Sequence, residues 1–417
     1  MTTSSLFQSI QYRFPWSALK AVLRILGLPP SQGMKKTIIR LNDIYREEQK
    51  NASEGYTDNI KKFEELKNLY KQHLLVGEKT VRIFRLSDNQ LEKISSLFSS
   101  CTSLNEGSLM KAYPFVDSRY ASTAFNDTQS EEQEEFPTFI PDPTPKLVAI
   151  DSLENNSKVF VFSSERLVFQ RNKISIANFR SQIDGTESLS LEEDDEEIDI
   201  STIRELIAIR KEVRQFFDVV VLREEEKILE FRIDTTLKVS KEELILHFRK
   251  LTNHFRDLVR NDSSEELILD TQINFFPLIN SLYQSQEGEV CAVSFTTDEG
   301  LIENSKMRLK DSDLRTESFH SAGSEASEIT PFRLDIKWKK FLSSDLGAEN
   351  QNPALIYPRL FLPGTFYDVS QQYNEDDTIL DPLLNYVMVS GCVDIESYDF
   401  LFGKIIEHIT YADNEQG

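Results

Sequence analysis

Apolar residues recur every three or four positions in several stretches of the chain, which is the period of one buried face of an α-helix. The clearest stretch begins at Ser240, where Glu243 completes a capping box, and continues through an apolar stripe that includes Leu244, Phe248 and Leu251. The same period predicts helices over residues 17–26, 32–50, 59–75, 88–99, 203–215, 240–260 and 398–409.

Short runs rich in β-branched and aromatic residues lie between these helices and predict strands. They cover residues 80–86, 147–150, 158–162, 217–222, 228–233, 290–296, 332–338 and 355–362. The runs at 217–222 and 228–233 flank five charged residues, which predicts an antiparallel hairpin. Because the elements follow no regular βαβ order, we expect an α+β fold. In it, an N-terminal helical hairpin precedes a body of two subdomains with a mixed or antiparallel sheet.

Three polar stretches interrupt these patterns. Residues 121–146 are polar, acidic and rich in proline, and seven of the eight residues from 192 to 199 are acidic. The segments 121–146 and 187–199 are therefore expected to be flexible, because neither can bury enough apolar surface to become ordered. Residues 311–328, rich in serine and charge, are expected to form a long loop. We predict a helical domain over 1–76, an α+β middle domain over 77–275 and a β-rich α+β domain over 276–417.

Composition excludes several classes of protein. The 417 residues include 47 Lys and Arg against 69 Asp and Glu, a net charge of −22, which repels nucleic acid and anionic membranes except at a basic patch. Cys101, Cys291 and Cys392 are far apart, which excludes a disulfide scaffold and favours the cytoplasm, or the nucleus in a eukaryote. No apolar run reaches the roughly 18 residues of a membrane helix, so no membrane partner is expected.

Charge is distributed unevenly along the chain. Residues 1–42 contain six basic residues and no acidic residue. Within this segment Ser17 and Ser31 can each cap a helix, Gly27 can end the first helix, and the Pro-Pro pair that follows prevents its continuation. The pattern predicts a helical hairpin with Lys35 and Lys36 near the start of the second helix. Cations beside exposed amides at a helix start favour a phosphate ligand.

A recurring arrangement of residues marks this hairpin between about residues 14 and 45. It consists of Leu19-Lys20, Leu23, Gly27-Leu28-Pro29-Pro30-Ser31, Gly33, Lys35 and Ile38-Ile39-Arg40-Leu41. This arrangement resembles a SAP domain, a helical hairpin that typically binds DNA through its turn and the start of its second helix. That family usually has Ser or Thr directly before Gly, whereas here one residue intervenes. The resemblance implies DNA contacts by Ser31, Gly33, Lys35 and Lys36, and the candidate set adds Lys20, Arg24 and Arg40.

Other interpretations of the N-terminus remain open. A segment without acidic residues that contains Ser and Arg is also typical of an organellar transit peptide, although the Gly-Leu-Pro-Pro break argues against one. The helix over 17–26, with Phe14 and Trp16 beside it, is also compatible with a position on a membrane surface. A third alternative is that the basic hairpin packs on the acidic body of the same chain.

Few residues predict catalysis, and neither a cofactor nor a metal is expected. The chain has no glycine-rich phosphate loop and no histidine pair with metal-ligand spacing. Asp335 and Lys337 alternate on one predicted strand, as do the Mg²⁺-binding acid and the lysine of PD-(D/E)xK nucleases. Such chemistry also needs a second acid, for which Asp311, Asp313 and Glu317 are candidates by position alone.

The sequence therefore favours a non-enzymatic, DNA-binding accessory subunit of a DNA-handling or genome-defence assembly. The basic hairpin would contact the phosphate backbone, and the acidic body would bind a protein partner. One alternative is a metal-dependent nuclease of the PD-(D/E)xK type that uses Asp335, Lys337 and Mg²⁺. The other is a protein-interaction scaffold that does not bind nucleic acid.

Overall fold

The computed structural model describes residues 3–51, 58–101, 143–153, 156–174, 188–190, 197–199, 206–237, 239–308, 312–342, 354–370 and 382–415. Most of the acidic segments 121–146 and 187–199 lies outside these ranges. The chain divides into two compact units. The first consists of Met1–Ser118, Pro145–Ser163 and Phe217–Gly417, and the second of Arg119–Thr144 and Ser164–Phe216. The domain boundaries expected near residues 76 and 275 stay predictions.

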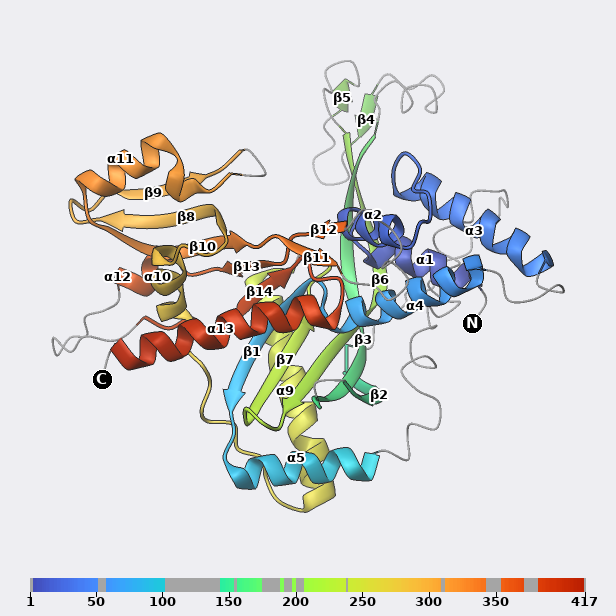
Figure 1. The fold of residues 1–417 in the computed structure, drawn as a ribbon, viewed down its shortest axis with the longest axis horizontal. Helices are drawn as coiled ribbons and strands as arrows, with labels where there is room; N and C mark the ends of the chain where they lie inside the picture. Colours follow the sequence, from blue (N-terminus) through green and yellow to red (C-terminus); the bar gives the residue numbers. More distant parts are fainter. Residues whose placement is uncertain are drawn as a thin grey trace. The chain divides into compact units, whose positions relative to one another are not determined.

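The fold is α+β, as the sequence predicts, and its main sheet follows the order β2-β3-β6-β7-β1-β14-β13-β10-β8-β9 (Figure 1). All pairings described between its strands are antiparallel. The strands are β1 (Lys79–Arg85), β2 (Lys146–Ser152), β3 (Lys158–Ile174), β6 (Leu206–Arg223), β7 (Ile228–Asp234), β8 (Glu289–Thr297), β9 (Ile302–Lys306), β10 (Ile329–Lys337), β13 (Arg359–Leu362) and β14 (Val387–Ser390). Two further antiparallel pairs are β4 (Ser188–Ser190) with β5 (Glu197–Asp199), and β11 (Lys340–Leu342) with β12 (Ala354–Ile356).

Helices cover both faces of the part of the sheet that lies in the first unit. They are α1 (Thr3–Arg13), α2 (Trp16–Ile25), α3 (Met34–Asn51), α4 (Asp58–Val76), α5 (Asp88–Cys101), α9 (Lys241–Ser263), α10 (Phe276–Gln284), the 3₁₀ helix η5 (Leu314–Thr316), α11 (Ser318–Ala326), α12 (Phe366–Ser370) and α13 (Ile395–Glu415). Side chains of α5 and α9 pack in one apolar cluster, and those of α1, α2, α4, α10 and α13 pack in another.

Alternation along the central strands separates the two clusters. On β6, Val219 and Val221 belong to the cluster under α13, whereas Val220 and Leu222 belong to the cluster under α9. Successive side chains of a strand point to opposite faces, so a strand buried on both faces needs a continuous apolar run. The hairpin predicted from residues 217–233 is confirmed, since β6 and β7 pair antiparallel across the charged turn.

Helix α9 forms for the reasons visible in its sequence. The Ser240 side chain accepts a hydrogen bond from the Glu243 amide, and the Glu243 carboxylate accepts one from the Ser240 amide. The predicted stripe is buried, and Phe255 on the same face makes edge-to-face contacts with Phe160 and Phe231. The capping box and the aromatic contacts together fix the start and the buried face of this helix.

The secondary structure expected for two segments is wrong. The helix expected over 203–215 is a strand over its described part, because β6 begins at residue 206 and continues unbroken into the core. The long loop expected over 311–328 contains η5 and α11 instead. There the side chain of Asp313 accepts a hydrogen bond from the Arg315 amide, and that of Glu317 accepts one from the His320 amide. The acidic residues that suggested a loop are helix caps.

Charged side chains occupy one face of β7 although the strand is fully buried. Leu229, Phe231 and Ile233 join the cluster under α9, so the residues between them face the opposite side. One of these is Glu230, which is 0% exposed. Its carboxylate accepts hydrogen bonds from Arg223 Nε, from Arg232 Nε at 3.0 Å and from the Tyr398 hydroxyl at 2.6 Å. Burial alone would raise the pKa of Glu230, but the two guanidinium groups outweigh it and lower the pKa to about 2.

A second buried ion cluster anchors the N-terminal helices at the end of β7. The Asp234 carboxylate lies 3.9 Å from Arg13 at the end of α1 and accepts a hydrogen bond from the Phe217 amide at 3.2 Å. Burial opposes the charge on Asp234, but Lys79 and Arg13 outweigh it and lower the pKa to about 2. The Arg13 guanidinium also lies 4.8 Å from the centre of the Phe217 ring. Helix α1 is therefore attached to the sheet by both charge and packing.

His73 is a buried titratable group in the same layer. Its Nδ1 lies 2.9 Å from the carbonyl oxygen of Cys392, and its ring is 4.4 Å from that of Phe14. Burial lowers the pKa of His73 to about 4, and the hydrogen bond to Cys392 only partly opposes this effect. The ring is therefore neutral at pH 7.

We expect Glu230→Ala to reduce the free energy of unfolding by about 3–5 kcal/mol, because it leaves two buried guanidinium groups without their shared carboxylate. Glu230→Gln keeps the volume but not the charge, and should lose most of the same free energy. Urea unfolding followed by circular dichroism measures both. Glu225→Ala, in the exposed turn of the same hairpin, is the matched control and should change stability by less than about 0.5 kcal/mol. Equal effects at the two positions would contradict this account.

We also expect the free energy of unfolding to fall between pH 6.5 and 4 in part because of His73. Over this range the unfolded chain binds a proton at His73 and the folded chain does not, so acidification favours unfolding. The loss from this residue alone should be of the order of 3 kcal/mol. Denaturant unfolding at several pH values should show a shallower pH dependence for His73→Gln than for the wild type. Parallel curves would show that His73 binds its proton equally in the folded and unfolded chains, so that burial does not lower its pKa.

Candidate functional site

The two helices predicted for the basic hairpin are present as α2 and α3, and α3 packs against α1 and α4. Helix α2 buries Leu19, Val22 and Leu23, and packs against α4, β11 and β12. Lys20 and Arg24 lie four residues apart on its exposed face. The hairpin shares its apolar cluster with the sheet, so the body of the first unit holds it in place.

The turn that ends α2 follows the sequence prediction. Gly27 has a φ angle of 63°, its amide donates to the Arg24 carbonyl, and the Leu28 amide donates to the Leu23 carbonyl at 2.9 Å. These two bonds define a Schellman motif, which needs a residue with positive φ after the helix. Gly27 therefore ends α2 as expected.

Neither predicted cap is present at the helix starts. Helix α2 begins at Trp16 after Pro15, so Ser17 lies within its first turn. Ser31 also does not cap α3, because the helix begins three residues later at Met34; the Ser31 amide donates to the Thr37 hydroxyl at 2.9 Å. The first helical bond of α3 goes instead from the Thr37 amide to the Gly33 carbonyl at 3.1 Å. Gly33 has a φ angle of 89°, a conformation that glycine adopts without strain.

The open turn makes the start of α3 accessible. A Cβ atom added at Gly33 would meet no atom within 4 Å, so a ligand can approach this part of the backbone. Lys35 and Lys36 follow in the first turn of the helix, where backbone amides have no partner within the helix. Arg40 lies one turn beyond Lys36. The structure therefore places three cations on the half of α3 that begins at this turn.

The candidate cations are exposed and unpaired. The five residues are Lys20, Arg24, Lys35, Lys36 and Arg40. Among the residues that the structure describes, none of the five forms an ion pair. Three cations in the interior of the first unit differ, since Arg13, Arg223 and Arg232 contact buried carboxylates. The hairpin thus carries uncompensated positive charge in a chain of net charge −22.

The structure places Asp335 and Lys337 away from open solvent, at 8% and 9% exposure. The Nε and Nη2 atoms of Arg359 on β13 donate to the two carboxylate oxygens of Asp335. These hydrogen bonds raise the pKa of Arg359. Lys337 lies 3.1 Å from the Glu289 carboxylate. Arg359, 24 positions along the chain from Asp335, occupies the oxygens that a metal ion would need, and sequence spacing could not reveal it.

The acids considered as further metal ligands have other partners. Asp313 forms an ion pair with Arg315 at 2.6 Å, Glu317 caps α11, and Asp311 lies outside the described residues. Within the described ranges no three His, Cys, Asp or Glu side chains are placed to hold a metal ion.

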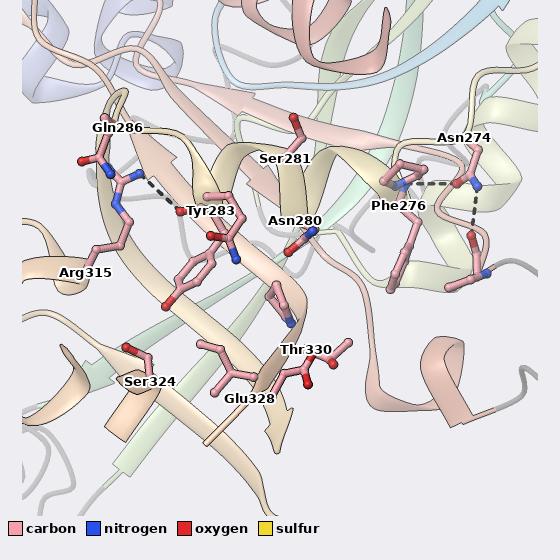
Figure 2. Close-up of a pocket in the computed structure, with 15 residues that line it drawn as sticks. Asn274, Phe276, Asn280, Ser281, Tyr283, Gln286, Arg315, Ser324, Glu328 and Thr330 are labelled. Carbon is pink, nitrogen blue, oxygen red and sulfur yellow. Dashed lines mark hydrogen bonds between the residues drawn. The ribbon is translucent and has the colours of Figure 1, made fainter. Parts of the chain in front are cut away.

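A pocket of about 770 Å³ lies between α10, Arg315, α11 and the start of β10. Figure 2 shows that its lining is mostly polar and uncharged, with Asn280, Ser281 and Thr330 among the labelled residues. The charge of Arg315 is paired with a carboxylate at the edge of the pocket. Its guanidinium contacts Asp313 and donates to the carbonyl oxygens of Glu287 and Gly288.

One nucleophile in this pocket has a base beside it. The Ser281 hydroxyl and His408 Nδ1 are 2.8 Å apart and join α10 to α13. They are 127 positions apart, so no sequence pattern predicted the pair. Burial lowers the pKa of His408, partly opposed by Glu287 and Glu407. The other ring nitrogen, Nε2, has no hydrogen-bond partner among the described residues, so no acid orients the ring as in a catalytic triad.

No model of a known protein family matches the chain, and no curated protein matches it. The resemblance to a SAP domain therefore depends on the residues of the hairpin alone. Across the described ranges, no helix is long and apolar enough to cross a membrane.

We expect the contact between Asp335 and Arg359 to contribute to stability. Asp335→Ala and Arg359→Ala should each lower the free energy of unfolding, and the double variant should cost less than the sum of the two. Because Arg359 is partly exposed, solvent screens the pair, and the coupling should be about 1 kcal/mol. Urea unfolding of the four proteins gives the value. A rise in melting temperature with Mg²⁺ that Asp335→Ala abolishes would contradict the structural role.

Proposed function

We propose that the protein binds DNA without cleaving it, as an accessory subunit of a DNA-handling or genome-defence assembly. The observation that carries the proposal is the set of five exposed cations on α2 and the first half of α3, none of which forms an ion pair with another described residue. Phosphate contacts by Lys and Arg supply most of the free energy of non-specific DNA binding, because each contact releases counterions from the DNA. The resemblance of the same residues to a SAP domain favours the same partner.

The distribution of charge supports a restricted binding surface. Acidic residues outnumber basic residues by 22 in the whole chain, so most of the surface repels a polyanion. The hairpin is a local exception, with no acidic residue before Asp43. A duplex would therefore be attracted to α2 and α3 and repelled elsewhere.

Helix geometry adds to the attraction at the start of α3. The helix dipole places positive potential at this end, and the first amides point away from the helix toward a ligand. Lys35 and Lys36 lie in the same turn. A phosphate group bound there would meet backbone donors and two ammonium groups together.

The acidic remainder of the chain offers a surface to a protein partner of the assembly. A subunit that binds DNA weakly through a few phosphates needs such a partner to act at a chosen place. We therefore propose a protein complex in the cytoplasm, or in the nucleus if the organism is a eukaryote. The nuclease alternative has no specific observation in its favour, because Arg359 donates hydrogen bonds to the carboxylate oxygens of Asp335 that would bind Mg²⁺.

We expect Lys35→Glu with Lys36→Glu to abolish DNA binding at low salt and to leave the fold intact. Glutamate at a helix start is stabilised by the helix dipole, so the change should not unfold α3. Fluorescence anisotropy with a labelled duplex measures the affinity. For the wild type, engagement of about four phosphates predicts a slope of roughly −3 to −4 for log K against log salt concentration.

The matched control reverses two exposed cations elsewhere, with Lys241→Glu and Arg249→Glu on α9. This variant has the same net charge as the first and should keep most of the affinity. Equal loss in both variants would show that only net charge matters. A wild-type protein that binds neither duplex nor single-stranded DNA at low salt would disprove the proposed function and leave the scaffold alternative.

A further inference from the structure

A short ribbon of two strands lies directly against the first helix of the basic hairpin. Strands β11 and β12 pair antiparallel and pack on α2, as Figure 1 also shows. Leu342, Ala354 and Ile356 are buried in the same apolar cluster as the inner face of α2. One face of the ribbon is therefore fixed against the hairpin.

The other face of the ribbon carries an exposed aromatic ring. Phe341 precedes the buried Leu342 and is 61% exposed. Its cross-strand partner is Leu355, and Tyr357, two residues beyond Leu355, is 37% exposed. Because side chains alternate along a strand, Phe341 and Leu355 lie on the face opposite the buried one. Phe341 therefore stands on the outer face of an element that packs on α2, and Tyr357 follows just after the end of β12.

The Tyr357 ring lies beside positive charge. The Lys337 ammonium is 5.1 Å from the centre of the Tyr357 ring, and Lys339 precedes the ribbon with its side chain 45% exposed. Both lysines contact Glu289, so their charge is partly compensated. The cations of the neighbouring hairpin form no ion pair with the residues that the structure describes. Exposed rings next to a basic surface are the two components of a site for single-stranded nucleic acid.

We infer that the nucleic acid held by the basic hairpin is single-stranded where it crosses the ribbon, and that Phe341 stacks on one of its bases. This inference rests on the proposed function. A duplex hides its base faces in its own stack, so an exposed ring gains little from it. A single strand presents a free face on every base, and stacking on an aromatic side chain tolerates any sequence. The hairpin supplies the backbone contacts, and the ribbon supplies the preference for unpaired bases.

The test compares Phe341→Ala with the wild type in fluorescence anisotropy. The probes are labelled oligothymidylate, labelled oligouridylate and a labelled duplex, each about 20 nucleotides long, which exceeds the site of a typical single-strand-binding domain. Phe341→Ala should weaken binding of the single strands by about fivefold to a hundredfold, and binding of the duplex by less than about twofold. The salt dependence should not change, because no phosphate contact is lost. The two single strands distinguish DNA from RNA as the source of the bases.

Phe319→Ala is the matched control, since Phe319 is also exposed but lies on α11. It should bind all three probes as the wild type does. If Phe341→Ala behaves like Phe319→Ala while the wild type binds DNA, the stacking inference is overturned and the proposed function stands. If the wild type binds none of the probes, both fail. Equal losses for single strand and duplex would also overturn the inference, because they indicate a general change in the ribbon.

Discussion

The buried carboxylate of Glu230 is the interaction on which one layer of the first unit depends. It accepts hydrogen bonds from the guanidinium groups of Arg223 on β6 and Arg232 on β7 and from the hydroxyl of Tyr398 on α13. Arg223 also donates a hydrogen bond to Asp399 on α13, and Arg232 donates one to the carbonyl oxygen of Leu75 on α4. A charge so far from water is tolerated only when all its partners are in place. The hairpin β6–β7, helix α13 and helix α4 are therefore held in one mutual arrangement.

This arrangement determines which cations remain available at the surface. Inside the first unit, Arg13 and Lys79 face Asp234, and the arginines of the hairpin β6–β7 face Glu230. In the first turn of α3, by contrast, Lys35 and Lys36 form no ion pair within the described part of the chain. Because Arg13 attaches α1 to the sheet just before α2 begins, the hairpin keeps one buried face and one exposed basic face. The buried cations are thus paired with buried carboxylates, whereas the exposed cations of the basic hairpin are available to a ligand.

The two parts of the proposed interface have different physical roles. Phosphate contacts by the hairpin are long-ranged, weaken with salt and do not distinguish sequences. Stacking on Phe341 is short-ranged and requires a free base face. The buried Asp335, in contact with Arg359, contributes to neither role and belongs to the packing of β10 against β13. A basic helix beside an aromatic ribbon therefore combines attraction to any strand with a preference for unpaired bases.

The sequence alone determined several helix ends and one strand hairpin, because these features depend on residues close together in the chain. The capping box at Ser240, the Schellman glycine Gly27 and the apolar runs of the hairpin β6–β7 act within a few residues, so their patterns predicted the elements. Tertiary structure decided the rest. Residues 206–215 extend a core strand although their apolar spacing also suits a helix, and Asp313 caps a helix in a stretch that reads as a loop. The partners Asp335–Arg359 and Ser281–His408 come together only when distant segments pack, because a side chain's charge and reactivity depend on neighbours that sequence spacing does not encode.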